Sequence, residues 1–205
     1  MKSTDTPQAN TNIPGRRKPS QGPFRKETAQ AEWAAGLFLV LFLAILFGCQ
    51  LQIWAYRTSA MYLEDALAAS NLASAVIDIR EYGKSHTLLI GDPLQAYEIY
   101  QGALRDNLGL DANWECGNRD LIAGRVTVER YIVYNVKDGM VRAVQISEDG
   151  SVREETGPVG RMEAPNGVPI VSTGIYSEIS FPVEGFLGTT VTARKGKLVD
   201  VTAYQ

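Results

Sequence analysis

Few residues of this sequence could carry out acid–base, nucleophilic or metal chemistry. His86 is the only histidine, so a catalytic Ser-His-Asp or Cys-His arrangement would have to use it. Cys116 lies in the segment NWECGNRD without a second cysteine nearby, which excludes a two-cysteine metal knuckle. The acidic pair Glu154-Glu155 falls at a predicted strand end, where solvated carboxylates are expected. Phosphate-binding, nucleophile-elbow and zinc-protease motifs are missing from the sequence. The sequence therefore predicts a protein that is not an enzyme and needs no cofactor or metal.

The other cysteine, Cys49, lies in a long apolar segment. Residues 33–55, WAAGLFLVLFLAILFGCQLQIWA, contain no charge over 23 positions. At a rise of 1.5 Å per residue this is a helix of about 34 Å, enough to cross a hydrocarbon core of about 30 Å. We predict one transmembrane helix at residues 32–55 and therefore a single-pass protein of the cell membrane.

The residues before Cys49 allow a second interpretation of the apolar segment. Leu46-Phe47-Gly48-Cys49 resembles a lipobox, in which cleavage before the cysteine is followed by lipid attachment to its sulfur. The preceding apolar run of 11 residues, 37–47, has a fitting length for a signal peptide. However, Phe47 is bulky for its position, and the apolar pattern continues beyond Cys49. We favour an unmodified Cys49 inside the span and keep lipidation as the alternative.

Residues 1–31 form a polar, basic segment before the span. They hold six basic and two acidic residues with almost no large apolar side chain, so they cannot bury enough surface to offset ordering entropy. We predict a disordered tail in the cytoplasm, because Lys and Arg beside a span are retained on that side. Of the chain's 20 basic and 23 acidic residues, 14 and 21 remain for the part predicted to lie outside. That acidic balance argues against nucleic acid or an anionic membrane surface as a partner.

After the span, a helical pattern continues without Pro or Gly as far as Gly83. Apolar side chains recur at alternating steps of three and four residues, as expected for one face of a helix. This stripe consists of Met61, Ala68, Leu72, Ala75 and Ile79. We predict an amphipathic helix at residues 56–83 that continues the span as one helix of about 50 residues and ends at Gly83 as its C-cap.

A second, shorter helix has clear signals at both ends. Asp92 is a suitable N-cap, Pro93 occupies the first helical position, Gln95 can complete a capping box, and Gly109 follows the last apolar residue. Its predicted apolar face consists of Leu94, Tyr97, Tyr100, Ala103, Leu104 and Leu108. A face of that width implies packing against another element.

From Gly124 onward the apolar period changes to two, which is typical of strands. Asp-Gly turns at 138–139 and 149–150 predict a three-stranded meander, followed by a strand at residues 170–183. Two last strands, 189–194 and 198–204, are predicted to meet at Lys195-Gly196-Lys197. Because nearly all links are too short for a parallel crossover, we expect an antiparallel sheet. The prediction is an α+β chain whose residues 84–205 form one extracytoplasmic domain.

This order of elements resembles the type IV pilin-like proteins, and in particular the minor pseudopilins of tight-adherence (TadE-like) pili. The resemblance is carried by residues 29–43, AQAEWAAGLFLVLFL, and by residues 62–83, YLEDALAASNLASAVIDIREYG. It implies a pilin-like fold in which a long N-terminal helix, half membrane-spanning and half amphipathic, supports a C-terminal antiparallel sheet. It also implies other pilin-like subunits, or a pilus or secretion assembly platform, as partners.

Glu32 is the residue to which the resemblance assigns a role. A carboxylate at the membrane edge of a packed bundle can select helix register by pairing with a charged group of another subunit. In the family a peptidase cuts after a Gly and leaves Glu at the fifth mature position. For Glu32 that cut would fall before Thr28, where no Gly stands, and a cut after Gly22 would make Glu27 the fifth residue. The sequence leaves both a processed and a full-length chain open.

The function expected from these features is structural: a pilin-like subunit or assembly component of a bacterial surface pilus or secretion apparatus. The alternative is an extracytoplasmic module that binds an unknown ligand on a plain membrane anchor or on a lipid at Cys49.

Overall fold

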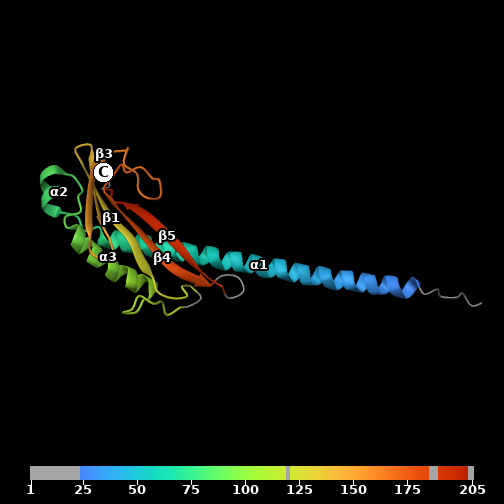
Figure 1. Cartoon of the computed structure of the whole chain (residues 1–205). Helices are drawn as coiled ribbons and strands as arrows, with labels where there is room; N and C mark the ends of the chain where they lie inside the picture. Colours follow the sequence, from blue (N-terminus) through green and yellow to red (C-terminus); the bar gives the residue numbers. More distant parts are fainter. Residues whose placement is uncertain (1–23, 119–120, 185–188, 203–205) are drawn as a thin grey trace, which may run out of the picture. The chain divides into compact units, whose positions relative to one another are not determined.

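The computed structural model of the chain describes residues 24–118, 121–184 and 189–202 (Figure 1). Residues cluster into two compact units, Met1–Gln52 and Ile53–Gln205, which we describe separately. The elements are a long helix, two shorter helices and a five-stranded antiparallel sheet. The predicted α+β fold class, with its long N-terminal helix and C-terminal antiparallel sheet, is therefore confirmed.

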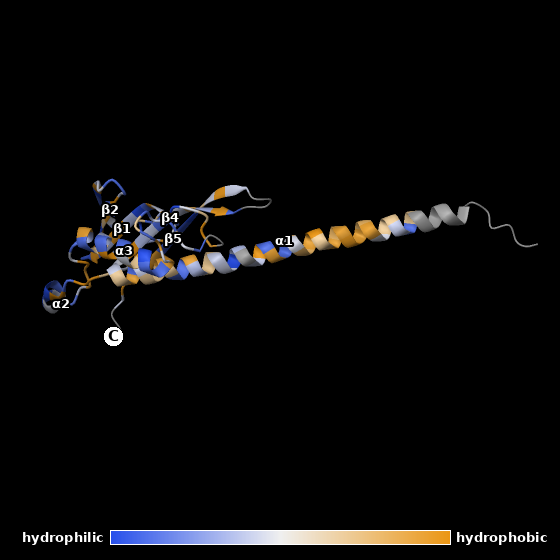
Figure 2. Ribbon diagram, turned by 90° about the horizontal axis from the view of Figure 1, so that it is seen from below, coloured by the Kyte–Doolittle hydropathy of each residue, from blue (hydrophilic) through white to orange (hydrophobic). Residues whose placement is uncertain are grey.

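Helix α1 (Phe24–Ser74) provides all of the described structure in the first unit. Every described side chain at residues 31–48 is exposed. Figure 2 shows this part of α1 as a largely hydrophobic ribbon. Within the described residues, one helix is long and apolar enough to cross a membrane, and it is this one. An apolar stretch that no described residue covers is a candidate for a membrane span.

Helix α1 begins earlier than predicted. Residues 24–31, which we expected to be disordered, are helical, whereas residues 1–23 of the predicted tail lie outside the described part. Their sequence, FRKETAQA, contains mostly good helix formers and neither Pro nor Gly, so the helix of the apolar segment extends through them. As a result, Glu32 lies about two turns inside the helix rather than at its first turn.

Helix α1 also ends earlier than predicted, at Ser74 instead of Gly83. The chain then turns into an extended segment, in which Ile77 forms an antiparallel bridge with Ile90. Asp78 accepts hydrogen bonds from the backbone N–H groups of Arg80 and Glu81 and so caps a separate short helix, α2 (Ile79–Ser85). Asp78 and Glu81 have the spacing of a capping box. This local signal starts a new helix, so the long helix does not continue to Gly83 as the apolar period suggested.

The buried face of α1 in the second unit differs from the predicted stripe. Met61 and Leu72 are each 61% exposed, and Ile79, which belongs to α2, is 81% exposed. The buried positions are Leu63, Ala66, Leu67, Ser70, Asn71 and Ser74. The prediction was wrong because half of this face consists of small polar residues. Hydrogen bonds make the burial of these side chains possible, but polar residues do not contribute to the apolar period on which the prediction was based.

Helix α3 (Pro93–Leu108) confirms the predicted end signals. Asp92 accepts hydrogen bonds from the N–H groups of Leu94 and Gln95, and Gly109 takes the left-handed conformation at the C-terminus. Its buried residues are Ala96, Tyr97, Tyr100, Leu104 and Leu108. The predicted face is correct apart from Leu94, which is 52% exposed, and Ala103, which is half-buried.

The sheet contains five antiparallel strands in the order β3-β2-β1-β4-β5. The strands are β1 (Thr127–Lys137), β2 (Met140–Ile146), β3 (Val152–Pro158), β4 (Gly174–Glu184) and β5 (Thr190–Asp200). The first three form the predicted meander. Asp138 and Gly139 both have positive φ, at 51° and 75°, as a type I′ hairpin turn requires.

The last two predicted strands are one continuous strand, β5, with Gly196 in its middle. A Cβ atom at residue 196 would overlap the hydroxyl of Tyr176 on the neighbouring strand β4. Gly196 is therefore needed for close packing under the Tyr176 ring rather than for a turn. Glycine flanked by two lysines is typical of a turn in sequence, and only the partner strand reveals its actual role.

Two hydrophobic clusters stabilise the second unit, one on each face of the sheet. On one face, α1 and α3 pack against side chains that include Tyr131, Ile175 and Ile179. The opposite face is covered in part by the connection between β3 and β4, where Ala164 and Ile170 are buried. The first cluster places α1 against strands β4 and β5, where polar contacts and a pocket also occur.

Candidate functional site

Glu64 on α1 lies between two lysines of strand β5. Its carboxylate oxygens are 2.8 Å from the Nζ of Lys195 and 2.7 Å from the Nζ of Lys197. The hydrogen bonds from Lys195 and Lys197 lower the pKa of the Glu64 carboxyl from 4.5 to about 2. Lys195 and Lys197 face the helix because alternate residues of β5 point to the same face of the sheet. The three charges fix the helix beside the edge strand.

Asn71, two turns further along α1, is buried and binds the sheet backbone. Its Nδ2 donates to the carbonyl oxygens of Lys197 at 2.9 Å and of Ile175 at 3.5 Å. Its Oδ1 is buried and, within the described part of the chain, has no hydrogen-bond partner. An amide that satisfies backbone carbonyls beside an edge strand holds the helix in one register on the sheet.

Polar groups also link α1 to α3. The Nδ2 of Asn107 donates to the Oγ of Ser70 at 3.0 Å, and the hydroxyl of Tyr62 donates to the carbonyl oxygen of Asn107 at 2.7 Å. Ser70 in turn donates to the carbonyl oxygen of Ala66. These contacts explain why small polar residues are tolerated on the buried face of α1.

Three tyrosines pack together beneath the helices. The Tyr131 ring lies 5.2 Å from that of Tyr97 and 4.8 Å from that of Tyr100, measured between centroids. The Tyr131 hydroxyl donates to the Oγ of Ser74 at 2.9 Å. Burial raises the pKa of all three hydroxyls above the ordinary value of 10, so they stay protonated at neutral pH. The three rings therefore pack as neutral side chains in the core.

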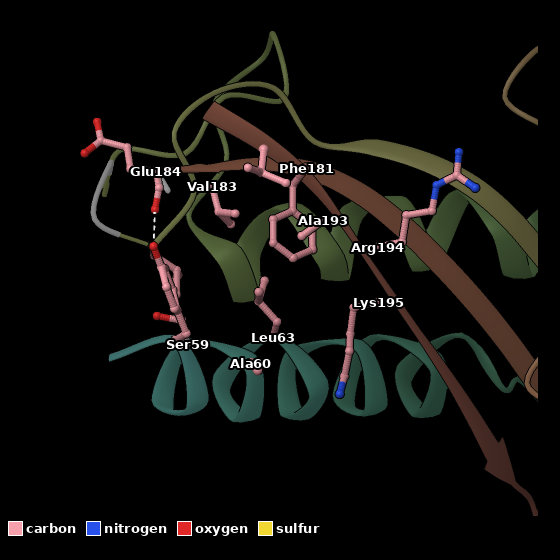
Figure 3. Close-up of a pocket in the computed structure, with 12 residues that line it drawn as sticks. Ser59, Ala60, Leu63, Phe181, Val183, Glu184, Ala193, Arg194 and Lys195 are labelled. Carbon is pink, nitrogen blue, oxygen red and sulfur yellow. Dashed lines mark hydrogen bonds between the residues drawn. The ribbon is translucent and has the colours of Figure 1, made fainter. Parts of the chain in front are cut away.

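A pocket of about 460 Å³ lies between the start of α1 in the second unit and the hairpin of β4 and β5 (Figure 3). Phe181, Val183 and Ala193 point from the strands toward Leu63 on the helix. The Tyr56 hydroxyl donates to the carbonyl oxygen of Glu184 at 2.7 Å and joins the helix to the hairpin at one end of the pocket. The pocket is therefore apolar inside and has its polar groups at the edges.

The two residues singled out in the sequence both lie on the part of α1 in the first unit. Glu32 is exposed. Cys49 is half-buried, and its thiol is free. Neither residue belongs to the polar contacts or the pocket of the second unit.

Cys116 and His86 have structural surroundings. The Cys116 thiol is free, half-buried and 3.4 Å from the carbonyl oxygen of Leu108, to which it donates. His86 has a φ of 54°, caps the C-terminus of α2 and packs edge-on against Tyr82. Within the described residues, His, Cys, Asp and Glu side chains form no group of three that could hold a metal ion.

Comparison with models of protein families, with curated proteins and with solved structures found no match. The sequence signals did not reveal the contacts of Glu64 or the pocket. Glu64 and its lysine partners are far apart in the chain, and the pocket walls come from residues near 60, 121, 182 and 193. No local pattern brings such positions together.

Proposed function

We propose that the chain is a membrane-anchored structural or assembly subunit of the pilin-like kind. In this proposal residues 32–55 cross the cell membrane once, the N-terminus lies in the cytoplasm, and the α+β domain lies outside. The partners are other pilin-like subunits or the platform that assembles a pilus or secretion apparatus.

The observation that supports this proposal most directly is the uncovered apolar stretch of α1. The same helix continues past the stretch, and its last turns, from Leu63 to Ser74, supply a buried face of the domain core. The apolar stretch and this buried face therefore belong to one helix, as the proposed pilin-like subunit requires.

Glu32 supports an assembly role through its charge. It is an exposed carboxylate that directly precedes the uncharged residues 33–55. Such a charge is costly at the edge of the hydrocarbon unless a partner compensates it, so we propose that it pairs with a charged group of another subunit or of the platform.

Crosslinking in membranes tests the proposal. We expect Glu32→Ala to insert in the membrane and fold as the wild type does, but to lose most crosslinks to neighbouring membrane proteins. The matched control is Asp65→Ala, which removes an exposed carboxylate from the same helix beyond the span. If the crosslinks of Glu32→Ala equal those of the wild type and of Asp65→Ala, Glu32 has no assembly role and the chain is better described as a plainly anchored domain.

A further inference from the structure

We propose that the pocket between α1 and the hairpin of β4 and β5 binds one acyl chain of a membrane phospholipid. This inference rests on the proposed membrane anchor and names a ligand for the domain next to it. It is carried by the position of the pocket along α1, by its lining and by the charges around it.

The position of the pocket follows from the helix on which it is built. Its helical wall consists of Tyr56, Ser59, Ala60 and Leu63. These residues follow the last apolar residue of the span, Ala55, by one to eight positions, or about 1.5 to 12 Å along the helix axis. The headgroup layer beside the hydrocarbon core is roughly 5 to 7 Å thick. With residues 32–55 in the hydrocarbon, the near end of the pocket lies at the depth of the lipid headgroups.

The lining suits an unbranched apolar chain better than a water-soluble ligand. Phe181, Val183, Val191 and Ala193 form the sheet wall of the pocket, opposite Leu63. Figure 3 shows the side chains of Glu184 and Arg194 pointing away from the interior. Lys195 is held by Glu64. A polar ligand would lose its hydration without gaining partners inside, whereas an acyl chain would gain contacts with the walls.

The charges near the pocket favour the phosphate of the same lipid. Lys195 and Lys197 of β5 are paired with Glu64, and Glu184 also lies at the edge of the pocket, so Arg194 is the basic residue of β5 that we expect to meet the phosphate. Arg194 is exposed, as is Arg57, which follows Tyr56 on the helix. Basic side chains at the level of the headgroups attract anionic lipid.

Photolabelling of the full chain in bilayer nanodiscs tests the inference. The probe is phosphatidylglycerol with a diazirine in its acyl chain, and labelled peptides are identified by mass spectrometry. We expect label both on residues 33–55 and on the pocket segments 56–63 and 181–184. Ala60→Trp, which fills the pocket, should reduce the pocket label at least tenfold. The control Ala69→Trp adds the same ring at an exposed position of α1 outside the pocket and should leave the label unchanged.

Each other outcome overturns the inference in a recognisable way. Label on residues 33–55 alone would refute the lipid pocket but leave the membrane anchor standing, whereas no label on either segment would refute both. Equal pocket label in Ala60→Trp and wild type would show nonspecific contact. A photoreactive amino acid at Ser59 that crosslinks to a second copy would show that a protein fills the pocket. If Ala60→Trp does not fold, Ala193→Leu narrows the pocket from the sheet side and should also reduce the label.

Discussion

Replacement of Leu67 by alanine tests which face of α1 supports the domain. Leu67 is fully buried in the cluster between α1, α3 and the sheet. Truncating a buried leucine to alanine lowers the free energy of unfolding by about 2 to 5 kcal/mol. This cost combines the lost burial of the removed atoms with the cavity that they leave behind. Leu67 is buried on all sides, so we expect about 3 kcal/mol. For a domain of this size each kcal/mol corresponds to roughly 2 to 4 °C, which predicts a melting temperature lower by about 6 to 12 °C.

Leu72→Ala is the matched control, because Leu72 lies on the same helix and is 61% exposed. An exposed substitution of this kind changes stability by less than about 0.5 kcal/mol. The assay is thermal unfolding of the full chain in mild detergent, followed by near-ultraviolet circular dichroism of the buried tyrosines. Equal shifts for the two variants would contradict the assignment of Leu67 to the buried face, and a larger shift for Leu72→Ala would show that the stripe predicted from the sequence is the buried one.

Three further predictions concern charge, close packing and lipidation. Glu64→Gln should be less sensitive to acid than the wild type. The carboxylate stabilises the fold fully above its unfolded pKa of 4.5, and this contribution is lost as the pH falls through its folded pKa of about 2. Melting curves of both proteins at pH 7 and pH 3 measure how much stability each loses in acid. Gly196→Ala should lower stability by about 1 to 3 kcal/mol in urea unfolding, because its Cβ would overlap Tyr176. Gly102→Ala, where nothing lies within 4 Å of the added atom, should instead stabilise α3. Metabolic labelling with palmitate should give no signal that disappears in Cys49→Ser, and a signal that does disappear would establish the lipid-anchored alternative.

Local signals in the sequence predicted the elements whose ends depend only on neighbouring residues. The caps of α3 at Asp92 and Gly109 and the turn at Asp138-Gly139 follow from backbone chemistry within a few positions. The continuous strand β5 could not be predicted, because the role of Gly196 depends on Tyr176 of another strand.

The face of α1 was mispredicted because its buried polar residues bind groups far along the chain, whereas its end was mispredicted because the local capping signal of Asp78 was overlooked. Asn71 is buried because its amide reaches the carbonyl oxygen of Lys197, 126 positions later in the chain. Apolar periodicity ignores such contacts and selects the stripe that contains Leu72 instead. The candidate site consists almost entirely of contacts of this kind, so the sequence did not indicate the pocket or the pair of lysines around Glu64. The roles of Glu32 and Cys49 stay predictions.

The topology of the chain is the central claim, and cysteine accessibility measures it directly. In a background with Cys49→Ser and Cys116→Ser, a cysteine is placed at Val171, which is 61% exposed in the domain. A second variant has its cysteine at Ser3, in the predicted cytoplasmic tail. On intact cells or spheroplasts, a membrane-impermeant maleimide should label Val171→Cys at once and Ser3→Cys only after lysis. Labelling of Ser3→Cys alone before lysis would reverse the proposed orientation, and recovery of the protein in the soluble fraction would contradict the membrane anchor itself.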